Sequence, residues 1–504
     1  MQKQLIQDWQ NVEFSFQPNA QAEHDLFVAD FGSRMTLMEA VQGRPSAKTV
    51  LSEELKKLKK DEENATPKQL KVSYEGKGGL TAMILMGTAS SFVVQDQMKK
   101  AFAAILTAGD DAKIVQINLR GLSATHAQNV LEWVASLCVL TRFRPEIYGK
   151  KLEERKPLGK LSVHILTGLN KKVAESIVEK GRILAICNNQ SRSLSEMPSN
   201  VLHPKSYRDH VEKLAKEWGV AFNFIDVKQL TKKGAGAFLA VCRADLNERA
   251  GIVHLHYKGK KAKKKVAIVG KGICFDTGGY NVKVGEYMYG MHQDMSGSAV
   301  AVSLFRALVE LEAPYEVHCY LALAENLISH EGFRPSDIVV ASNGMSIEVI
   351  NTDAEGRMVL SDTLVIASEQ KPDLIIDYAT LTGSIIRSID TRRSGCYSNQ
   401  LKLSSLAVDV GERCGERVWN FPIGDDYNDA LKSEHADIRQ CASAAAADHI
   451  YAATFLSKFV GKNVPWVHVD LAAESNKGGL GLVPTESTGF GVRFGYELIT
   501  KVLG

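Results

Sequence analysis

The second half of the chain alternates short apolar runs with segments of helical periodicity. The apolar runs are rich in β-branched residues, which favour strands, and they cover 266–270, 317–326, 373–381 and 466–472. Helical patterns lie between these runs, at 296–312 and 357–370. Apolar strands that alternate with helices are typical of a sheet covered on both faces. The pattern therefore predicts an α/β fold with a mostly parallel central sheet flanked by helices.

The length of 504 residues exceeds what one hydrophobic core usually supports, so two domains are expected. Strand-like and helical runs also alternate before about residue 160, which predicts a smaller N-terminal α/β domain over 1–165, acting as a scaffold or oligomer contact. A helical stretch follows at 170–194, and Pro198 and Pro204 interrupt it. We therefore predict a helical linker over 166–200 and a larger domain over 201–504.

The composition is that of an ordinary globular protein, with 45% apolar and 24% charged residues. The net charge of +3 is small for this length, so nothing points to nucleic acid or to an anionic membrane as a partner. The N-terminal region has no apolar stretch of signal-peptide length, and no run approaches a membrane span. We expect a cytoplasmic protein whose eight cysteines are reduced and mostly buried.

Polar residues occur where the predicted strands end. Lys271 and Asp276 follow the first apolar run, Glu325 and Asn326 end the second, and Asp470 lies late in the fourth. Ligands of open α/β sheets bind beyond the carboxyl ends of the strands. These ends are therefore the expected place for a functional site.

Acidic residues gather in three segments beside the strands. KGICFDTGG carries Asp276, HQDMSG carries Asp294, and NTDAEGR carries Asp353 and Glu355. Asp353 and Glu355 are two positions apart, so in an extended loop both side chains point to the same side. Carboxylates held close together repel one another, and divalent metal ions would remove that repulsion. The alternative is that these residues are solvated acids or helix caps, as Asp294 would be before 296–312.

The ligand types constrain the metal. Histidine and cysteine are absent from the set, which favours Mn²⁺ or Mg²⁺, although Zn²⁺ and Co²⁺ also accept oxygen ligands. The number of carboxylates indicates two ions, which would hold a water molecule and lower its pKa. Such an arrangement supports hydrolysis. From spacing alone, a metal site and a set of solvated acids remain equally open.

Longer motifs around these residues resemble those of the leucyl aminopeptidase family, the cytosol aminopeptidases. The motifs are VGKGICFDTGGYNVK at 269–283, MHQDMSGSAV at 291–300, NTDAEGRMVLSD at 351–362 and DYATLTGS at 377–384. NTDAEGR is the signature of that family, and the order and spacing of the other motifs match as well. The similarity extends from about residue 180 to the C-terminus, while the first domain matches only in size and general pattern.

The resemblance implies a role for each residue of the cluster. Lys271, Asp276, Asp294 and Glu355 would hold a tightly bound metal ion, with Lys271 acting through a neutral amine, and Asp276, Asp353 and Glu355 would hold a more exchangeable one. Lys283 would stabilise the oxyanion of the tetrahedral intermediate. Arg357 would anchor a bicarbonate ion that acts as the general base. Without the resemblance, Arg357 is expected to form a salt bridge with Asp353 or Glu355, and Lys283 to be a surface lysine.

By the same resemblance, a pocket for the first side chain of the substrate would be lined by Met291, Thr380, Gly383, Ala472 and Ser475. The sequence departs from the family at Ser475, where some relatives carry methionine. It departs again at 441–459, where CASAAAADHIYAATFLSKF replaces a glycine-rich turn before a helix. Neither departure touches an expected metal ligand.

The sequence therefore predicts a metal-dependent aminopeptidase that removes the N-terminal residue of short peptides or dipeptides. The resemblance implies two divalent ions per subunit, most readily Mn²⁺ or Zn²⁺, with Co²⁺ or Mg²⁺ also possible, a bicarbonate ion, and assembly as a homohexamer. The main alternative is a structural or nucleic-acid-binding relative on the same fold, in which the chemistry is incidental. A two-metal phosphoesterase would need a phosphate cradle beside the same carboxylates.

Overall fold

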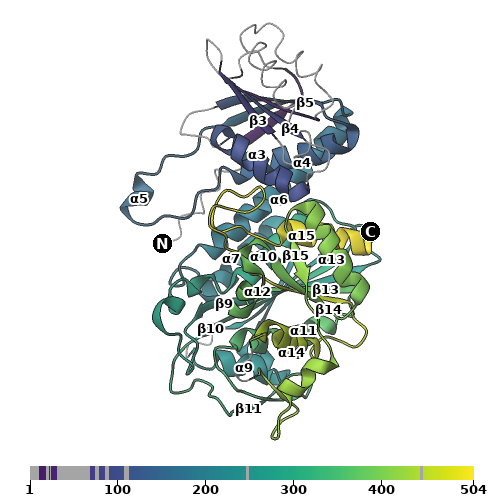
Figure 1. Ribbon diagram of the computed structural model, residues 1–504. Helices are drawn as coiled ribbons and strands as arrows, with labels where there is room; N and C mark the ends of the chain where they lie inside the picture. The colour runs from purple at the N-terminus through teal and green to yellow at the C-terminus, as the bar shows by residue number, and fades with distance from the viewer. Residues whose placement is uncertain are drawn as a thin grey trace. The chain divides into compact units, whose positions relative to one another are not determined.

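A computed structural model of the chain describes residues 11–18, 22, 24–30, 68–73, 79–85, 90–106, 113–245, 249–442 and 446–504 (Figure 1). The chain divides into two compact units. Unit 1 contains Met1–Asn189 and Lys477–Glu486, and unit 2 contains Gln190–Asn476 and Ser487–Gly504. Each unit combines a sheet with helices, which agrees with the predicted α/β class.

Unit 1 is built on a six-stranded sheet with the order β1-β6-β5-β2-β4-β3. Its neighbouring strands run parallel, except that β3 and β4 are antiparallel. The strands are β1 (Val12–Ser15), β2 (His24–Asp30), β3 (Lys68–Ser73), β4 (Gly79–Leu85), β5 (Lys113–Gly121) and β6 (Leu161–Leu166). The helices are α3 (Ser91–Leu106), α4 (Ala124–Leu140) and α5 (Lys150–Glu153), together with the long α6 (Lys171–Ser195), whose last residues, from Gln190, belong to unit 2.

The core of unit 1 forms between this sheet and its helices. Leu131 and Val134 of α4 pack with Ile117 of β5 and Val163 of β6, and all four side chains are fully buried. Leu482 and Val483 belong to the same core cluster, although they lie near the end of the chain. Their burial explains why Lys477–Glu486 groups with unit 1. The observed division thus differs from a continuous domain over 201–504.

Unit 2 is built on an eight-stranded sheet with the order β15-β14-β17-β13-β9-β10-β8-β7. The central strands β17, β13, β9 and β10 are parallel to one another, as predicted. Antiparallel pairs occur toward the edges, where β14 pairs with β17, β8 with β10, and β7 with β8. The strands are β7 (Ala221–Asp226), β8 (Gly251–Lys258), β9 (Lys265–Asp276), β10 (Glu316–Asn326), β13 (Leu374–Ala379), β14 (Ser394–Ser398), β15 (Val418–Asn420) and β17 (Trp466–Asp470).

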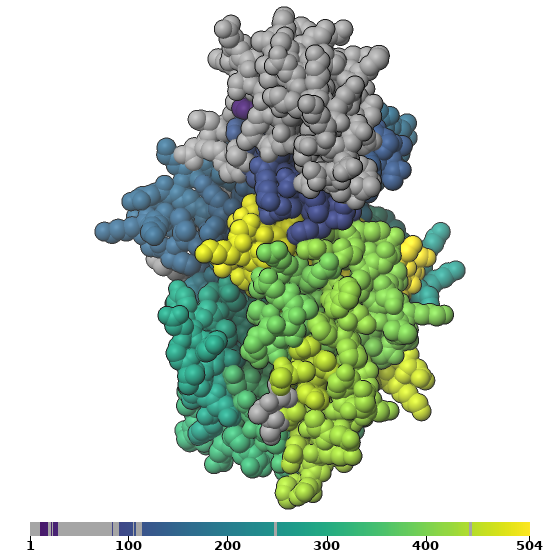
Figure 2. All heavy atoms as spheres, in the orientation of Figure 1, coloured from purple at the N-terminus to yellow at the C-terminus, as the bar shows by residue number. Residues whose placement is uncertain are grey.

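Helices cover both faces of this sheet (Figure 1). One face carries α7 (Pro204–Trp218), α10 (Ser296–Glu310), α13 (Leu401–Cys414) and α15 (Val492–Leu503). The other carries α9 (Gly236–Cys242), α11 (Glu355–Ser368) and α14 (Asp448–Ser457). Every residue of β13 and β17 is buried, as expected for strands covered on both sides. In the space-filling view, teal and green segments of unit 2 adjoin in one continuous surface (Figure 2).

Shorter elements complete unit 2. They are α8 (Val227–Lys232), α12 (Gly383–Ile389), the 3₁₀ turns η2 (Gly285–Met288), η3 (Met291–Gln293), η4 (Asp390–Arg392) and η5 (Asp425–Leu431), and a small sheet of β11 (Ile338–Val340), β12 (Ser346–Glu348) and β16 (Ile438–Arg439). η2 and η3 lie between β9 and α10, and α12 and η4 lie between β13 and β14. Met291 begins η3, and Gly383 begins α12.

One glycine fixes how closely a covering helix approaches the sheet. A Cβ atom at Gly297 of α10 would lie 2.2 Å from the backbone oxygen of Tyr378 in β13. Only glycine leaves room for this approach. Because Asp294 lies just before α10, the same contact places Asp294 against the sheet.

The helix boundaries near residue 200 follow the prolines. α6 ends at Ser195, and α7 begins at Pro204, which occupies the first helical position where the missing N–H costs nothing. His203 caps α7 by accepting a hydrogen bond from the Ser206 backbone N–H. All eight cysteine side chains are buried. Within the described ranges, no helix is both long enough and apolar enough to cross a membrane.

Candidate active site

The carboxyl ends of the central strands of unit 2 meet at one edge of the sheet. Asn326 at the end of β10 is paired in register with Asp276 at the end of β9, and Asp470 at the end of β17 is paired with Ala379 of β13. Thr380 follows β13 directly. These positions match the strand ends that the sequence singled out.

Three carboxylates converge at this edge. Asp276 ends β9, Asp353 lies in the loop before α11, and Glu355 is the first residue of α11. Ligand oxygens of these three side chains lie within 4.8 Å of one another. Asp276 and Glu355 are buried, whereas Asp353 is partly exposed. Residues that are 77 or more positions apart in sequence thus share one site.

Lys271 links this cluster to Asp294. Its Nζ lies 2.7 Å from Asp294 Oδ1 and 3.0 Å from Glu355 Oε1, and it donates a hydrogen bond of 2.8 Å to the backbone oxygen of Thr380. The Thr380 hydroxyl donates to the same Asp294 oxygen at 2.8 Å. Burial alone would lower the pKa of Lys271, but the surrounding carboxylates, led by Asp294, raise it above its usual value. Lys271 is therefore an ammonium here.

Lys283 occupies the opposite side of the cluster. Its Nζ lies 2.7 Å from Asp276 Oδ2 and 2.6 Å from Asp353 Oδ1. Although burial opposes the charge, Asp276 and Glu355 raise the pKa of Lys283. The expectation of a surface lysine, which rested on the residues without the resemblance, is wrong because the loop after β9 turns Lys283 into the site.

Burial is the main influence on the acids. It raises the pKa of Asp353 to about 6, with the neighbouring Asp276 carboxylate adding to the effect. Burial and Asp276 also raise the pKa of Glu355, and burial raises the pKa of Asp294. Carboxylates that crowd together away from water resist ionisation in this way. The site therefore favours the binding of additional positive charge.

The donor set fits divalent cations. Asp294 Oδ2 and Glu355 Oε2 are buried and have no hydrogen-bond partner among the described residues. A buried carboxylate oxygen without a partner is costly. Oxygen ligands without histidine or cysteine suit hard ions. The residues present could thus hold the metal ions that the sequence implied.

The loop that carries Asp353 is held by amide side chains. Gln440, fully buried, accepts hydrogen bonds from the backbone N–H groups of Ile350 and Asn351 and donates to the backbone oxygen of Ala354. Asn326 donates to Asp276 Oδ1 and to the backbone oxygen of Thr352. The loop is therefore fixed from both sides before it enters α11.

Arg357 has a partner that the sequence did not indicate. Its Nη1 and Nη2 lie 3.1 and 2.6 Å from Oδ1 and Oδ2 of Asp448, the first residue of α14. The expected salt bridge with Asp353 or Glu355 is therefore wrong, because the guanidinium points toward α14. A bicarbonate ion bound through the two terminal nitrogens would need the edge that Asp448 occupies, so the residues present do not fit bicarbonate at that edge.

The residues expected to line a substrate pocket belong to η3, to α12 and to the segments that follow β13 and β17. Met291 begins η3, Gly383 begins α12, and Ala472 follows β17. Ser475 forms an isolated antiparallel bridge with Ser487. Only Thr380 among the five predicted residues has a side-chain hydrogen bond to the cluster, through Asp294. The pocket itself stays a prediction.

Two site residues escaped the sequence analysis. Gln440 and Asp448 lie 83 and 91 positions from Arg357, outside every motif that was recognised. The only signal near them was the departure from the family at 441–459. That departure did not indicate that Asp448 pairs with Arg357.

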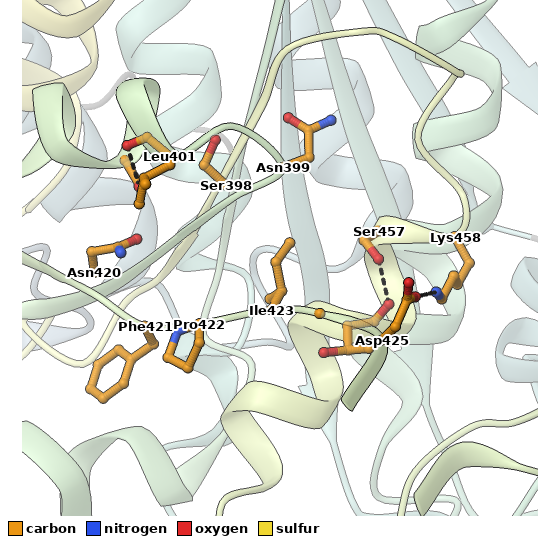
Figure 3. A pocket seen from close by; sticks show the side chains of 13 residues that line it. Ser398, Asn399, Leu401, Asn420, Phe421, Pro422, Ile423, Asp425, Ser457 and Lys458 are labelled. Carbon is orange, nitrogen blue, oxygen red and sulfur yellow. Dashed lines mark hydrogen bonds and ion pairs between the residues drawn. The ribbon is translucent and has the colours of Figure 1, made fainter. Parts of the chain in front are cut away.

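A surface pocket of about 590 Å³ lies elsewhere in unit 2 (Figure 3). It is lined by residues of β14, β15, α13, η5 and α14, such as Asn420, and by connecting residues such as Asn399 and Phe421. Asp425 and Lys458 face one another there at 4.0 Å. None of the clustered carboxylates lines this pocket, so it is separate from the candidate active site.

A second group of metal-type ligands lies on strands β8 and β10. His256 and His318 are cross-strand neighbours, and the Nε2 atom of each lies within 3.3 Å of Glu316 Oε1. His254 contacts His318 at 2.9 Å. Hydrogen bonds thus already engage Nε2 of His256 and both ring nitrogens of His318.

Comparison with known proteins identifies the class. The sequence profile of the "Cytosol aminopeptidase family, catalytic domain" matches residues 189–495. The chain is 38% identical over 368 residues to a probable cytosol aminopeptidase of Persephonella marina, covering 73% of each chain. It resembles the solved structure of a tomato leucine aminopeptidase mutant, with 27% identity, a TM-score of 0.79, and coverage of 97% of this chain and 96% of that chain.

A bottromycin maturation enzyme, BotP, solved in complex with Mn, is also similar. The identity is 27%, the TM-score is 0.77, and the match covers 96% of this chain and 100% of that one. The fold and the site thus define a hydrolase that acts on peptides. The chain belongs to the cytosol aminopeptidase family.

Proposed function

We propose that this protein is a metal-dependent aminopeptidase that releases the N-terminal residue of short peptides and dipeptides. The proposal rests on one observation, the site in which Lys271 and Lys283 form ion pairs with four carboxylates. Two of these carboxylates, Asp294 and Glu355, each have a buried oxygen without a hydrogen-bond partner among the described residues. Family membership supports the same reaction.

Two divalent ions would be held by the cluster. Lys271, Asp276, Asp294 and Glu355 would hold one, and Asp276, Asp353 and Glu355 the other. When bound, the ions would lower the pKa of a water nucleophile, polarise the scissile carbonyl and provide a site for the free α-amine of the peptide. Mn²⁺ and Zn²⁺ are the leading candidates, and Co²⁺ and Mg²⁺ also suit the oxygen ligands.

The chain's own groups would complete the reaction. Lys271 must give up its Nζ proton before its amine becomes a ligand. Lys283, released from Asp276 and Asp353, donates a hydrogen bond through Nζ to the oxyanion of the tetrahedral intermediate. Met291, Thr380, Gly383, Ala472 and Ser475 would contact the first side chain of the substrate.

The cellular location and the assembly of the enzyme are inferred from its relatives. Several are named cytosol aminopeptidases, which supports a cytoplasmic location here. We also propose a homohexamer, as the resemblance implies, and no role in nucleic-acid binding, since the net charge is only +3. The large exposed apolar side chains near the site support self-association.

A metal-restoration experiment tests the proposal. The purified protein is stripped of metal, and Mn²⁺, Zn²⁺, Co²⁺ or Mg²⁺ is restored separately before assays with aminoacyl amides, dipeptides and a phosphodiester. We expect metal-dependent release of the N-terminal residue and no phosphodiesterase activity. Glu355→Ala should lower kcat by about 10²-fold or more, the loss typical when an electrostatic group at a reaction centre is removed.

Glu369→Ala is the matched control. Glu369 lies at the other end of α11, where it forms an exposed ion pair with Lys233. Its removal should leave turnover unchanged. Wild-type turnover by Glu355→Ala at saturating metal would contradict the two-ion assignment.

A further inference from the structure

The pair formed by Arg357 and Asp448 is enclosed on the arginine side and open on the acid side. The Arg357 side chain is 2% exposed, whereas that of Asp448 is 30% exposed. Burial opposes the charge of Arg357, but Asp448 raises its pKa, so the guanidinium remains charged. Arg357 also donates a hydrogen bond of 3.3 Å to the backbone oxygen of Gln440, the residue that holds the Asp353 loop. Gln440 therefore connects the Arg357–Asp448 pair to the loop that carries Asp353.

The position of Asp448 is fixed by its neighbours. Asp448 opens α14, which packs against α11, the helix that starts with Glu355. The backbone N–H of His449 donates to Ser384 Oγ at 2.9 Å, and Ser384 follows the predicted pocket residue Gly383. Asp448 is thus held between the start of α11 and the start of α12, both of which border the site.

The geometry resembles that of a bound anion. A carboxylate presents two coplanar oxygens to the two terminal nitrogens of a guanidinium, and bicarbonate presents its oxygens in the same way. The contacts of 3.1 and 2.6 Å fill this edge of Arg357. Asp448 and bicarbonate cannot both use it.

We propose that the carboxylate of Asp448 takes the place of bicarbonate in this enzyme, so that turnover needs no added anion. This inference rests on the proposed aminopeptidase function. Asp448 accepts a proton from the attacking water as the C–O bond forms, and that proton passes to the amine as the C–N bond breaks. No group is oxidised or reduced, and Asp448 returns to its ionised form after each turnover.

The first test uses the wild-type protein alone. Its turnover of a dipeptide is measured with Mn²⁺ in buffer freed of carbon dioxide, with and without sodium bicarbonate at constant ionic strength. We expect the rate to be the same in both. A rate that falls without bicarbonate and returns with it would overturn the proposal.

Variants at position 448 give opposite expectations for rescue. Asp448→Ala should lose about 10²- to 10⁴-fold in kcat, the usual contribution of a general base, and should regain activity when bicarbonate or formate fills the vacated edge. Asp448→Asn keeps the shape of the side chain, so it should lose activity without being rescued. Asp429→Ala, which removes an exposed partner of Lys432, is the control and should behave as wild type.

A binding measurement separates this inference from the proposed function. Carbon-13 bicarbonate is titrated into metal-free protein and followed by NMR line broadening. Asp448→Ala should bind it, whereas wild type and Asp448→Asn should not. Bicarbonate binding to wild type at the affinity of Asp448→Ala would overturn the inference, even if no peptide were hydrolysed. If bicarbonate bound only to Asp448→Ala, as expected, but the wild-type protein hydrolysed no peptide, the proposed function would be overturned instead.

Discussion

Gly356 shows how a single residue position can decide the function of the site. A Cβ atom at Gly356 would lie 2.5 Å from Cε and 2.8 Å from Nζ of Lys271. Lys271 is buried and held by Asp294, Glu355 and Thr380, so it cannot move without breaking those contacts. The glycine in NTDAEGR is therefore required by the lysine that crosses the first turn of α11.

We expect Gly356→Ala to fold but to bind metal poorly. Alanine is favoured over glycine in a helix by about 1 kcal/mol, which offsets part of the clash. Displacement of Lys271 should weaken metal affinity by about 10- to 100-fold, the range seen when groups that orient a metal site are disturbed. Calorimetric titration with Mn²⁺ and a thermal melt measure the two effects.

Gly168→Ala is the control for this change, because a Cβ atom there meets nothing within 4 Å. Unchanged metal affinity in Gly356→Ala would contradict the proposed role of Lys271 as a ligand.

The ion-pair partner of Arg357 could not be predicted from residue types alone. An arginine beside two acids in NTDAEGR is expected to pair with them, yet Glu355 faces Lys271 and Asp353 faces Lys283. Arg357 instead reaches Asp448, 91 positions away. Nothing local in the sequence distinguishes these partners, because the choice depends on which helix packs beside α11.

At the scale of elements, strands β8 and β10 carry a histidine ladder. His254 stacks on Tyr320 with ring centroids 4.4 Å apart, and His256 stacks on His318 at 4.5 Å. Glu316 contacts His256 and His318 of this ladder, and Lys265 lies 3.9 Å from Glu316. Burial, with smaller effects from the neighbouring histidines, lowers the pKa of His254 and His318 from 6.5 to about 4. Both side chains are therefore neutral in the folded protein at neutral pH.

These pKa values predict an acid-induced loss of stability. Between pH 6.5 and about 4 the unfolded chain binds protons at His254 and His318 that the folded chain does not, so the free energy of unfolding falls as the pH falls. His254→Phe keeps the ring stack and removes one of these groups. Urea unfolding of both proteins across this range should show a smaller acid-induced loss in the variant.

The difference in the free energy of unfolding between wild type and His254→Phe should be constant above pH 6.5. Below pH 6.5 this difference should shift in favour of the variant. A difference that is constant down to pH 4 would contradict the assignment of neutral histidines.

The alternation of apolar runs and helical patterns correctly predicted the central parallel strands. Strands that are buried on both faces need apolar residues at every position, so their sequences are recognisable without any partner. The predicted helix over 170–194 matches α6, and its end follows from Pro198 and Pro204. The antiparallel strands at the edges of the sheet were not predicted, because edge pairing depends on contacts far apart in sequence.

At the scale of the whole molecule, the segment after Lys283 exposes several large apolar side chains. Val284, Tyr287 and Tyr289 are 72%, 77% and 93% exposed in the single chain. Exposed apolar side chains that gather in one segment often mark a contact with another protein. We take this segment as support for self-assembly beside the active site.

Light scattering after size exclusion tests the assembly. We expect a mass close to six times the 55.2 kDa chain. The double change Tyr287→Ser and Tyr289→Ser should lower the mass, because it removes apolar area that assembly would bury. Leu401→Ser, which removes an apolar side chain of similar exposure on α13, is the control. A wild-type mass of one chain would contradict the hexamer.

The sequence by itself determined the class of the protein through the signature NTDAEGR and the motifs around it, because these are local patterns that the family match confirms. The tertiary structure alone decided which charges meet. It brought Lys271 to the backbone oxygen of Thr380, grouped Leu482 and Val483 with the first unit, and set Asp448 against Arg357. The physical reason is the same in each case: packing of distant elements chooses the partners of buried groups, and no local pattern records that choice.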